Sequence, residues 1–265
     1  MTIIDAHAHI GLRPTGNIQH YLRMMERSGV ARTVLVAGDN LDPVRLADFI
    51  RGREPLLSAT PRNDLVEAAF RAHPDRFLGF FTVDPAIHTI EDVLGALEAG
   101  FVGLKFNPLV HQVDFGHPLA QEVFRLSQQR RVPLYTHVTL NPTAAIETLH
   151  NAIREFAPVL IVGHMGFAAG DWEAIELARD CDDVYLETSV GAYLAIKEAL
   201  RVAGPEKLIF GSEGPAHHQL AELAKIRALE QAPAVEAMIL GGNILRLLSA
   251  SSALPAAGDA LEAVV

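Results

Sequence analysis

The sequence predicts a single-domain α/β protein folded as a (β/α)8 barrel, the TIM barrel. Eight short β-rich runs alternate with amphipathic helical segments, and the length of 265 residues suits one such barrel. Several of the runs also end in histidine, lysine or glutamate side chains. Because enzymes of this fold work at the carboxyl ends of their strands, these residues predict a catalytic site as well as a fold.

The predicted strands are short runs rich in β-branched and apolar residues. They are Thr2–His9, Thr33–Ala37, Phe77–Val83, Val102–Phe106, Pro133–Val138, Val159–His164, Val184–Thr188 and Lys207–Ser212. Their spacing is typical of repeated βα units. The one long interval, between the second and third runs, predicts an inserted loop or extra helix around Arg51–Asp64.

The segments between these runs have the periodicity of amphipathic helices. They are Ile18–Ser28, Leu65–His73, Ile90–Ala99, Pro118–Arg130, Thr143–Phe156, Trp172–Asp180, Ala192–Val202 and Gln219–Leu229. Gly29 and Gly100 follow predicted helix ends, and Asn141 and Asp171 stand where N-caps belong. These end signals agree with the predicted boundaries.

A doubly wound open sheet is the competing architecture. It usually has fewer strands and carries a glycine-rich phosphate turn after the first strand, whereas this chain has His-Ala-His-Ile-Gly there. We therefore expect a barrel domain over residues 1–249. The remaining residues 250–265, rich in alanine, serine and proline, are expected to form a loosely ordered tail.

Composition narrows the classes of partner and location. The formal net charge of −10 disfavours nucleic acid and anionic membranes, and no apolar run approaches the ~20 residues of a membrane span. Neither a secretory leader nor a disulfide is expected, since the chain starts with a strand and Cys181 is its single cysteine. We expect a cytoplasmic protein acting on a small molecule, and the composition leaves homo-oligomerisation open.

Two histidines close the first predicted strand. In an extended strand alternate side chains share a face, so Asp5, His7 and His9 are expected to point the same way. Two imidazoles ~6–7 Å apart along one strand can converge on one cation. Asp5 is expected to hold an imidazole in its tautomer, and the alternative is a hydrogen bond at the base of the strand.

Four later strand ends carry residues that could complete such a site. Lys105 lies near the end of the fourth run, His137 lies in the fifth, His164 ends the sixth and Glu213 follows the eighth. Neutral imidazoles with a carboxylate suit Zn²⁺, and a bound divalent ion lowers the pKa of water toward ~7. The strand ends therefore predict one divalent metal ion, with Zn²⁺ preferred over Mn²⁺.

Lys105 and Asn107 are predicted to bind substrate. A buried ammonium could hold a substrate carboxylate, and Asn107, two residues on, could line the same pocket. The alternative for Lys105 is a structural ion pair with Glu187 or Asp84.

Several motifs together resemble the amidohydrolase superfamily, and most of all its metal-dependent hydrolase and decarboxylase branch, which includes aminocarboxymuconate semialdehyde decarboxylase. They are Asp-Ala-His-Ala-His (5–9), Tyr-Thr-His (135–137), Val-Gly-His-Met-Gly (162–166), Val-Tyr-Leu-Glu-Thr-Ser (184–189), Ile-Phe-Gly-Ser-Glu-Gly-Pro (209–215) and the segments 73–85 and 239–248. The resemblance implies a mononuclear site with His7, His9 and His137 as ligands. It also implies that His164 acts in catalysis or beside the metal.

One residue departs from this pattern. Where the resembled proteins usually have Gly-Ser-Asp, this chain has Gly211-Ser212-Glu213, and the longer side chain carries its carboxylate ~1.5 Å further from the backbone. Glu213 is expected to coordinate the metal or to act as a base through this longer arm. Weakened metal binding, altered chemistry or a non-catalytic relative are the alternatives.

The resemblance and the predicted site lead to three functional hypotheses. The first is a metal-dependent hydrolase in which Glu213 and His164 help an activated water attack a lactone, amide or related carbonyl. The second is a non-oxidative decarboxylase, or a hydratase, that uses the same site on a small carboxylic acid. The third is a non-catalytic barrel that binds a ligand or partner.

Overall fold

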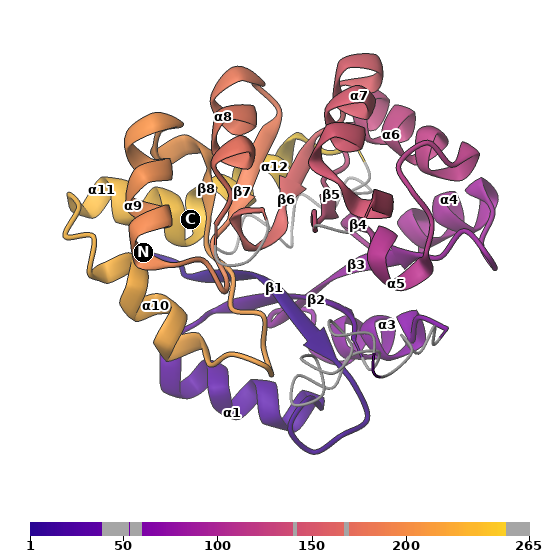
Figure 1. Cartoon of the computed structure of the whole chain (residues 1–265). Helices are drawn as coiled ribbons and strands as arrows, with labels where there is room; N and C mark the ends of the chain where they lie inside the picture. Colours follow the sequence, from indigo (N-terminus) through magenta and orange to yellow (C-terminus); the bar gives the residue numbers. More distant parts are fainter. Residues whose placement is uncertain (39–52, 54–59, 140–141, 167–169, 253–265) are drawn as a thin grey trace.

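The computed structural model of the chain describes residues 1–38, 53, 60–139, 142–166 and 170–252. Within them, eight parallel strands form one sheet in which each strand pairs with the next along the chain. Helices surround this sheet (Figure 1). The predicted (β/α)8 barrel is confirmed, and the doubly wound alternative is excluded because the strand order never reverses.

The strands are close to the predicted runs, and most are shorter. They are β1 (Ile4–Ile10), β2 (Arg32–Ala37), β3 (Phe77–Val83), β4 (Gly103–Phe106), β5 (Leu134–Thr136), β6 (Leu160–Val162), β7 (Val184–Glu187) and β8 (Leu208–Ile209). The polar residues that end the predicted runs therefore lie in the turns that follow β5, β6, β7 and β8. They are held there by turn geometry in addition to strand pairing.

Backbone hydrogen bonds close the barrel between its last and first strands. The Ala6 amide donates to the Phe210 carbonyl over 2.9 Å, and the His9 amide donates to the Gly214 carbonyl over 2.6 Å. In the other direction, the Glu213 amide donates to the His7 carbonyl over 2.9 Å. The segment that carries Glu213 therefore continues β8 alongside β1.

The helices confirm the predicted alternation. They are α1 (Ile18–Ser28), α3 (Asn63–Ala72), α4 (Ile90–Ala99), α5 (Pro108–His111), α6 (Pro118–Arg130), α7 (Ile146–Phe156), α8 (Trp172–Asp180), α9 (Tyr193–Val202), α10 (Gln219–Arg227), α11 (Pro233–Ala237) and α12 (Asn243–Ala250). Gly29 and Gly100 end α1 and α4 in left-handed conformations, and Asp171 caps α8 by accepting from the Glu173 amide. Short α5, α11 and α12 were not predicted from the sequence.

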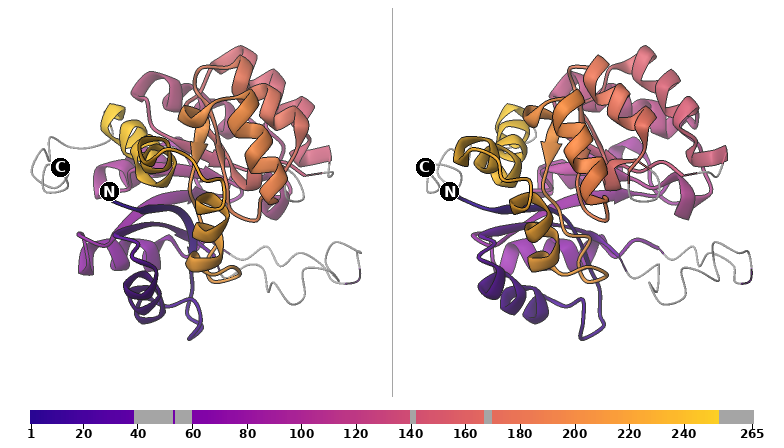
Figure 2. Two further views of the ribbon diagram at one scale, coloured as in Figure 1. Left: turned by 90° about the vertical axis from the view of Figure 1, so that its left-hand side faces the viewer. Right: turned by 60° about the vertical axis from the view of Figure 1, so that its left-hand side comes forward.

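The amino end of the barrel is filled by apolar side chains. Ile4, Val34, Phe80, Ile161 and Ile209 form one buried cluster with Ile244 and Leu247 of α12. A second and larger cluster lies between the strands and the surrounding helices. The last helices and the N-terminus lie at the same end of the molecule (Figure 2), so this end is closed and the opposite end is left for the site.

Some predictions fall outside the described residues. Most of the segment expected as an insertion (51–64), the cap at Asn141 and residues 253–265 of the expected tail lie there. The start of that tail is described: Ala250 still belongs to α12, and the Ser252 amide donates to the Arg130 carbonyl over 2.9 Å. No helix among the described residues has the length and hydropathy of a membrane span.

Candidate active site

A bulge in β1 decides which of its polar residues enter the barrel. The register with β2 shifts between Asp5 and Ala8, so β1 holds one extra residue there. Beyond the bulge, His7 and His9 face inward, where His7 stacks on Tyr135 with ring centroids 4.1 Å apart. Before the bulge, Asp5 faces the helix layer and accepts a 2.8 Å hydrogen bond from Gln219 of α10.

The expectation that Asp5 shares a face with the two histidines is therefore wrong, because the bulge breaks strict alternation. Its carboxylate accepts from the Ser212 amide (2.8 Å), the Ser212 hydroxyl (2.6 Å) and the His7 amide (3.2 Å). The His7 Nδ1 atom has no hydrogen-bond partner within the described part of the chain. Asp5 thus fixes the backbone that presents His7 and Glu213, and it does not orient an imidazole.

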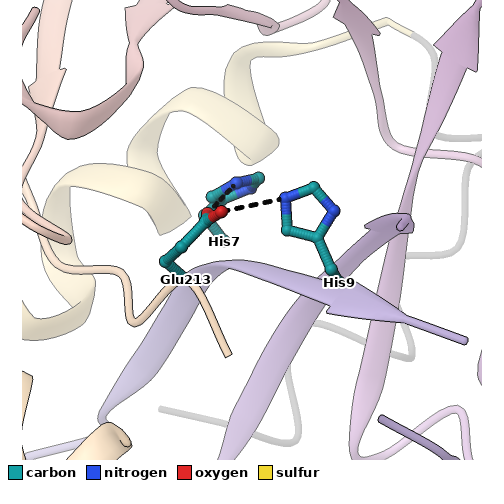
Figure 3. Close-up of side chains that lie close together, drawn as sticks. All are labelled: His7, His9 and Glu213. Carbon is teal, nitrogen blue, oxygen red and sulfur yellow. Dashed lines mark ion pairs between the residues drawn. The ribbon is translucent and has the colours of Figure 1, made fainter. Parts of the chain in front are cut away.

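Glu213 lies directly against the two histidines. Its Oε2 is 2.7 Å from His7 Nε2, and its Oε1 is 3.4 Å from His9 Nε2 (Figure 3). A φ of 55° places Glu213 in the left-handed region, where a residue other than glycine is held only by its surroundings. The longer arm expected from the sequence does reach the histidines.

The contact between Glu213 and His7 has the arrangement of two ligands around one centre. Although Oε2 is buried and close to Nε2, it has no partner with hydrogen-bond geometry among the described residues. The ligand atoms of His7, His9 and Glu213 all lie within 4.8 Å of one another. Two imidazole nitrogens and a carboxylate at these separations fit a divalent ion such as Zn²⁺.

The ammonium of Lys105 lies beside the same group. Its Nζ is 3.4 Å from both His7 Nε2 and His9 Nε2 and 5.0 Å from the centre of the Tyr135 ring. Burial lowers the pKa of Lys105 to about 8, against the opposing influence of Glu213 and Glu187. Lys105 therefore shares the site with the two histidines, and its charge is balanced in part by the carboxylates of Glu213 and Glu187.

Protonation in this cluster is set by burial and by close charges. Burial and the Lys105 ammonium lower the pKa of His7 well below its usual value, so this imidazole is neutral. Burial raises the pKa of Glu213, but His9, His7 and His164 outweigh it and hold the pKa well below its usual range. An ionised Glu213 carboxylate beside the neutral His7 imidazole is the protonation state that metal ligands need.

His137 lies near the cluster without joining it. Its ring centroid is 5.9 Å from that of His164, and it is not part of the group formed by His7, His9 and Glu213 among the described residues. Its Nδ1 is buried and has no hydrogen-bond partner in the described chain. Burial, followed by Lys105, lowers the pKa of His137 well below its usual value, so this ring is also neutral.

His164 follows β6 and lies close both to Glu213 and to residues at the end of β7. Its Nε2 is 3.8 Å from Glu213 Oε2, and its Nδ1 is 3.0 Å from Ser189 Oγ. Glu187, at the end of β7, accepts hydrogen bonds from Ser189 and from Tyr135 of β5. The histidine therefore bridges the candidate metal ligands and a buried carboxylate.

The remaining predicted residue, Asn107, has a structural contact. Its side-chain oxygen accepts a 3.1 Å hydrogen bond from the Val110 amide and so caps α5. That helix ends in His111, which is 8% exposed and whose two ring nitrogens have no hydrogen-bond partner within the described residues. His111 was not predicted as a site residue, because in the sequence it lies in the loop after the fourth strand and not at a strand end.

Glu187 and Ser189 were also not predicted as site residues. Both follow an apolar run at the carboxyl end of β7, and their spacing of two places them on one face. Polar residues alternating at the end of an otherwise buried strand were the signal that could have found them.

Comparison with known proteins agrees with this architecture. The chain resembles an uncharacterised TIM-barrel protein of Bordetella bronchiseptica (15% identity, TM-score 0.74, 94% of this chain and 99% of that one). It also resembles a probable 2-pyrone-4,6-dicarboxylic acid hydrolase of Acinetobacter baumannii with bound citric acid (16%, TM-score 0.70, 94% and 100%). A third similar structure is a dihydroxybenzoic acid decarboxylase of Polaromonas with bound manganese and 2-nitroresorcinol (17%, TM-score 0.69, 94% and 97%).

At these identities the structural matches establish the fold alone. No protein of curated function matches the chain by sequence. The family model described as amidohydrolase, however, matches residues 4–249, which is nearly the whole barrel. The chain therefore belongs to the amidohydrolase family, in agreement with the resemblance of its motifs.

Proposed function

We propose that this amidohydrolase-type enzyme is a metal-dependent hydrolase that cleaves a lactone, amide or related carbonyl of a small carboxylate-bearing molecule. The observation that carries the proposal is the approach of Glu213 to both His7 and His9, with an oxygen that is buried and yet lacks hydrogen-bond geometry. Family membership supports an enzyme over a non-catalytic barrel. The contact also argues against the alternative in which glutamate at position 213, in place of the usual aspartate, makes the barrel non-catalytic.

The proposed ligands are His7, His9 and Glu213, with His137 as a fourth residue, whose buried Nδ1 has no hydrogen-bond partner among the described residues. Zn²⁺ is the first choice for this donor set, and the manganese in a structurally similar decarboxylase keeps Mn²⁺ as the second. When bound, a divalent ion supplies Lewis acidity and lowers the pKa of water toward ~7.

The other residues then have separate tasks. A carboxylate with a pKa as low as that of Glu213 is a better ligand than a base, so we assign proton transfer to His164, whose Nε2 faces Glu213 Oε2. Water attacks the carbonyl carbon, and its proton passes through His164 to the departing oxygen or nitrogen. Lys105 holds a substrate carboxylate, because its buried ammonium already lies beside the proposed metal ligands.

Non-oxidative decarboxylation is the second candidate, because Lys105 lies so close to the histidines. An ammonium 3.4 Å from both Nε2 atoms could hold a carboxylate at the reacting position itself. Structurally similar proteins include both a hydrolase and a decarboxylase, so the fold does not choose between the two reactions. Hydration of a double bond would use the same residues.

One experiment separates these reactions. Protein purified without chelator is analysed for metal and then offered lactones, amides and hydroxybenzoates, with acid release and CO₂ release measured in parallel. We expect about one Zn²⁺ or Mn²⁺ per chain and metal-dependent acid release. CO₂ release without acid release would support the decarboxylase instead. Absence of a stoichiometric ion would contradict the metal site.

Composition carries the proposals on location and partners. A net charge of −10 supports a small-molecule substrate over nucleic acid, and a single cysteine supports a reducing cytoplasm. A homo-oligomer remains a proposal to be tested by light scattering.

A further inference from the structure

We propose that Glu187 and Ser189 act as positioning residues that keep the His164 proton on Nδ1 and leave its Nε2 free to face Glu213. This inference rests on the proposed role of His164 in proton transfer. It assigns a task to two residues of β7 and its following turn that the proposed reaction has not used.

The Glu187 carboxylate is saturated by donors. Its Oε1 accepts from the Ser189 amide over 2.5 Å, and its Oε2 accepts from the Tyr135 hydroxyl over 2.9 Å and from the Ser189 hydroxyl over 2.8 Å. The His164 amide adds a fourth, longer contact of 3.3 Å to Oε2. The two amides can only donate, one to each oxygen, and together with the two hydroxyls they favour an ionised carboxylate that accepts at every contact, against the burial that raises its pKa.

The direction of the next hydrogen bond follows from this saturation. A serine hydroxyl has one proton, and Ser189 donates it to Glu187. Its oxygen can therefore only accept from His164 Nδ1, which lies 3.0 Å away. A neutral imidazole that donates from Nδ1 carries a lone pair on Nε2, the atom that lies 3.8 Å from Glu213 Oε2.

The backbone around these residues is shaped for this arrangement. A Cβ on Gly211 would overlap Glu187 Oε1, and a Cβ on Gly163 would overlap the Tyr135 hydroxyl. Val190, directly after Ser189, has a φ of 62°, a conformation that is strained for a β-branched residue. Strain of this kind persists only where surrounding contacts enforce it, and here it places Ser189 between Glu187 and His164.

The tautomer can be measured without turnover. We would record long-range ¹H–¹⁵N spectra of histidine-labelled protein, both Zn²⁺-loaded and metal-free, and assign His164 with His164→Asn. The parent should show a protonated Nδ1. In Glu187→Gln the new amide can donate to Ser189 Oγ, so the hydroxyl reverses and donates to His164, which moves the proton to Nε2. Ser189→Ala should give a mixture of tautomers, and Ser189→Thr should keep the parent state.

Steady-state kinetics then test whether proton transfer requires the His164 tautomer that is protonated on Nδ1. On a verified substrate, Glu187→Gln should lower kcat by ~10²–10⁴-fold with a smaller change in KM, because only the proton-transferring step is affected. Ser189→Ala should have a smaller effect, and Ser189→Thr should restore much of the rate. Ser127→Ala is the matched control: Ser127 is also fully buried and hydrogen-bonded, but it lies on α6 and bonds the Val132 carbonyl.

The outcomes separate this proposal from the proposed function. A parent His164 protonated on Nε2, or a tautomer that Ser189→Ala and Glu187→Gln leave unchanged, would overturn the positioning role. A tautomer that shifts as expected while kcat stays at the parent value would confirm the positioning role and contradict proton transfer by His164. Because Ser189→Ala removes a single atom, it keeps the test decisive even if Glu187→Gln fails to fold.

Discussion

The two ends of this barrel are built from opposite chemistry. At the amino end, Ile4, Phe80 and Ile209 pack against Ile244 of α12, and the cluster they form is apolar apart from the tyrosine hydroxyls at its edge. At the carboxyl end, the same strands and the turns after them present imidazoles, an ammonium and carboxylates to one another. The amino end stabilises the fold and the carboxyl end holds a site that costs stability, because buried polar groups must be paired or neutralised.

Left-handed residues other than glycine occur at both ends of the barrel, in different settings. Arg131 and Ala157 end the helices α6 and α7, just before β5 and β6 begin. His164, Val190 and Glu213 all have φ values between 55° and 62°, and all three follow strands at the carboxyl end. A left-handed residue is an ordinary way to end a helix, whereas one that follows a strand beside a site is held there by the surrounding contacts. The comparison therefore predicts that substitutions at the carboxyl end change metal and turnover, whereas substitutions at the amino end change stability.

The largest effect is expected from removing both imidazoles of β1. The double variant His7→Ala, His9→Ala should lose the bound divalent ion and all measurable turnover, since two of three proposed ligands disappear. Elemental analysis after gel filtration measures the ion, and circular dichroism should show the parent fold. Full retention of metal would mean that the ion is held elsewhere.

Substitutions of Glu213 test the chemistry of the carboxyl end at a single residue. Glu213→Gln should weaken metal affinity and lower turnover by ~10²–10⁴-fold, because a neutral amide is a much poorer ligand for a divalent ion than a carboxylate. Glu213→Asp should also be worse than the parent, because the backbone is already set for the longer arm that brings Oε2 to 2.7 Å from His7 Nε2.

Steady-state kinetics and a metal titration of the two variants measure both effects. If both variants match the parent on a verified substrate, Glu213 lies outside the mechanism.

Phe80 provides the opposite test at the amino end. This fully buried ring belongs to the cluster closed by α12, and Phe80→Ala should lower the free energy of unfolding by ~3–5 kcal/mol. Denaturant unfolding measures that loss. The folded fraction should still bind one ion per chain, and a parallel loss of metal would show that the two ends are coupled.

The buried carboxyl group of Asp5 should make the free energy of unfolding depend on pH. Burial raises its pKa from 3.8 to about 6, against hydrogen bonds from Ser212 and Gln219. The folded state therefore binds this proton more tightly than the unfolded chain, so the free energy of unfolding should fall by about 3 kcal/mol as pH rises from below 3.8 through 6.

Asp5→Asn should remove that part of the pH dependence. Urea unfolding of the metal-free parent and variant between pH 3.5 and 7 gives the two slopes, and the difference between them isolates Asp5 from the other titrating groups. Parallel slopes would show that the Asp5 pKa is not raised in the fold.

The smallest effect is expected at Asn107. If its task is to cap α5, Asn107→Ala should cost ~1 kcal/mol of stability and Asn107→Ser should restore most of it. The KM for a verified substrate should change little in Asn107→Ser. A large rise in KM in that variant would restore the predicted role in substrate binding.

The strand order and most helix boundaries could be predicted from the chain because they depend on local signals. The helix Ile18–Ser28 is bounded by an asparagine cap and a C-terminal glycine, and its observed limits equal the predicted ones. His7, His9, His164 and Glu213 could be predicted for a similar reason: each lies at a strand end, and the barrel brings those ends together. The sequence by itself determined these features.

The tertiary structure alone decided three other features. The bulge in β1 turns Asp5 outward, and a bulge depends on pairing with β2 that a single strand does not reveal. The Glu187–Ser189–His164 contacts need two strands that are neighbours only after the sheet forms. The position of Lys105 between two histidines depends on distances across the barrel, which close packing fixes and linear spacing does not.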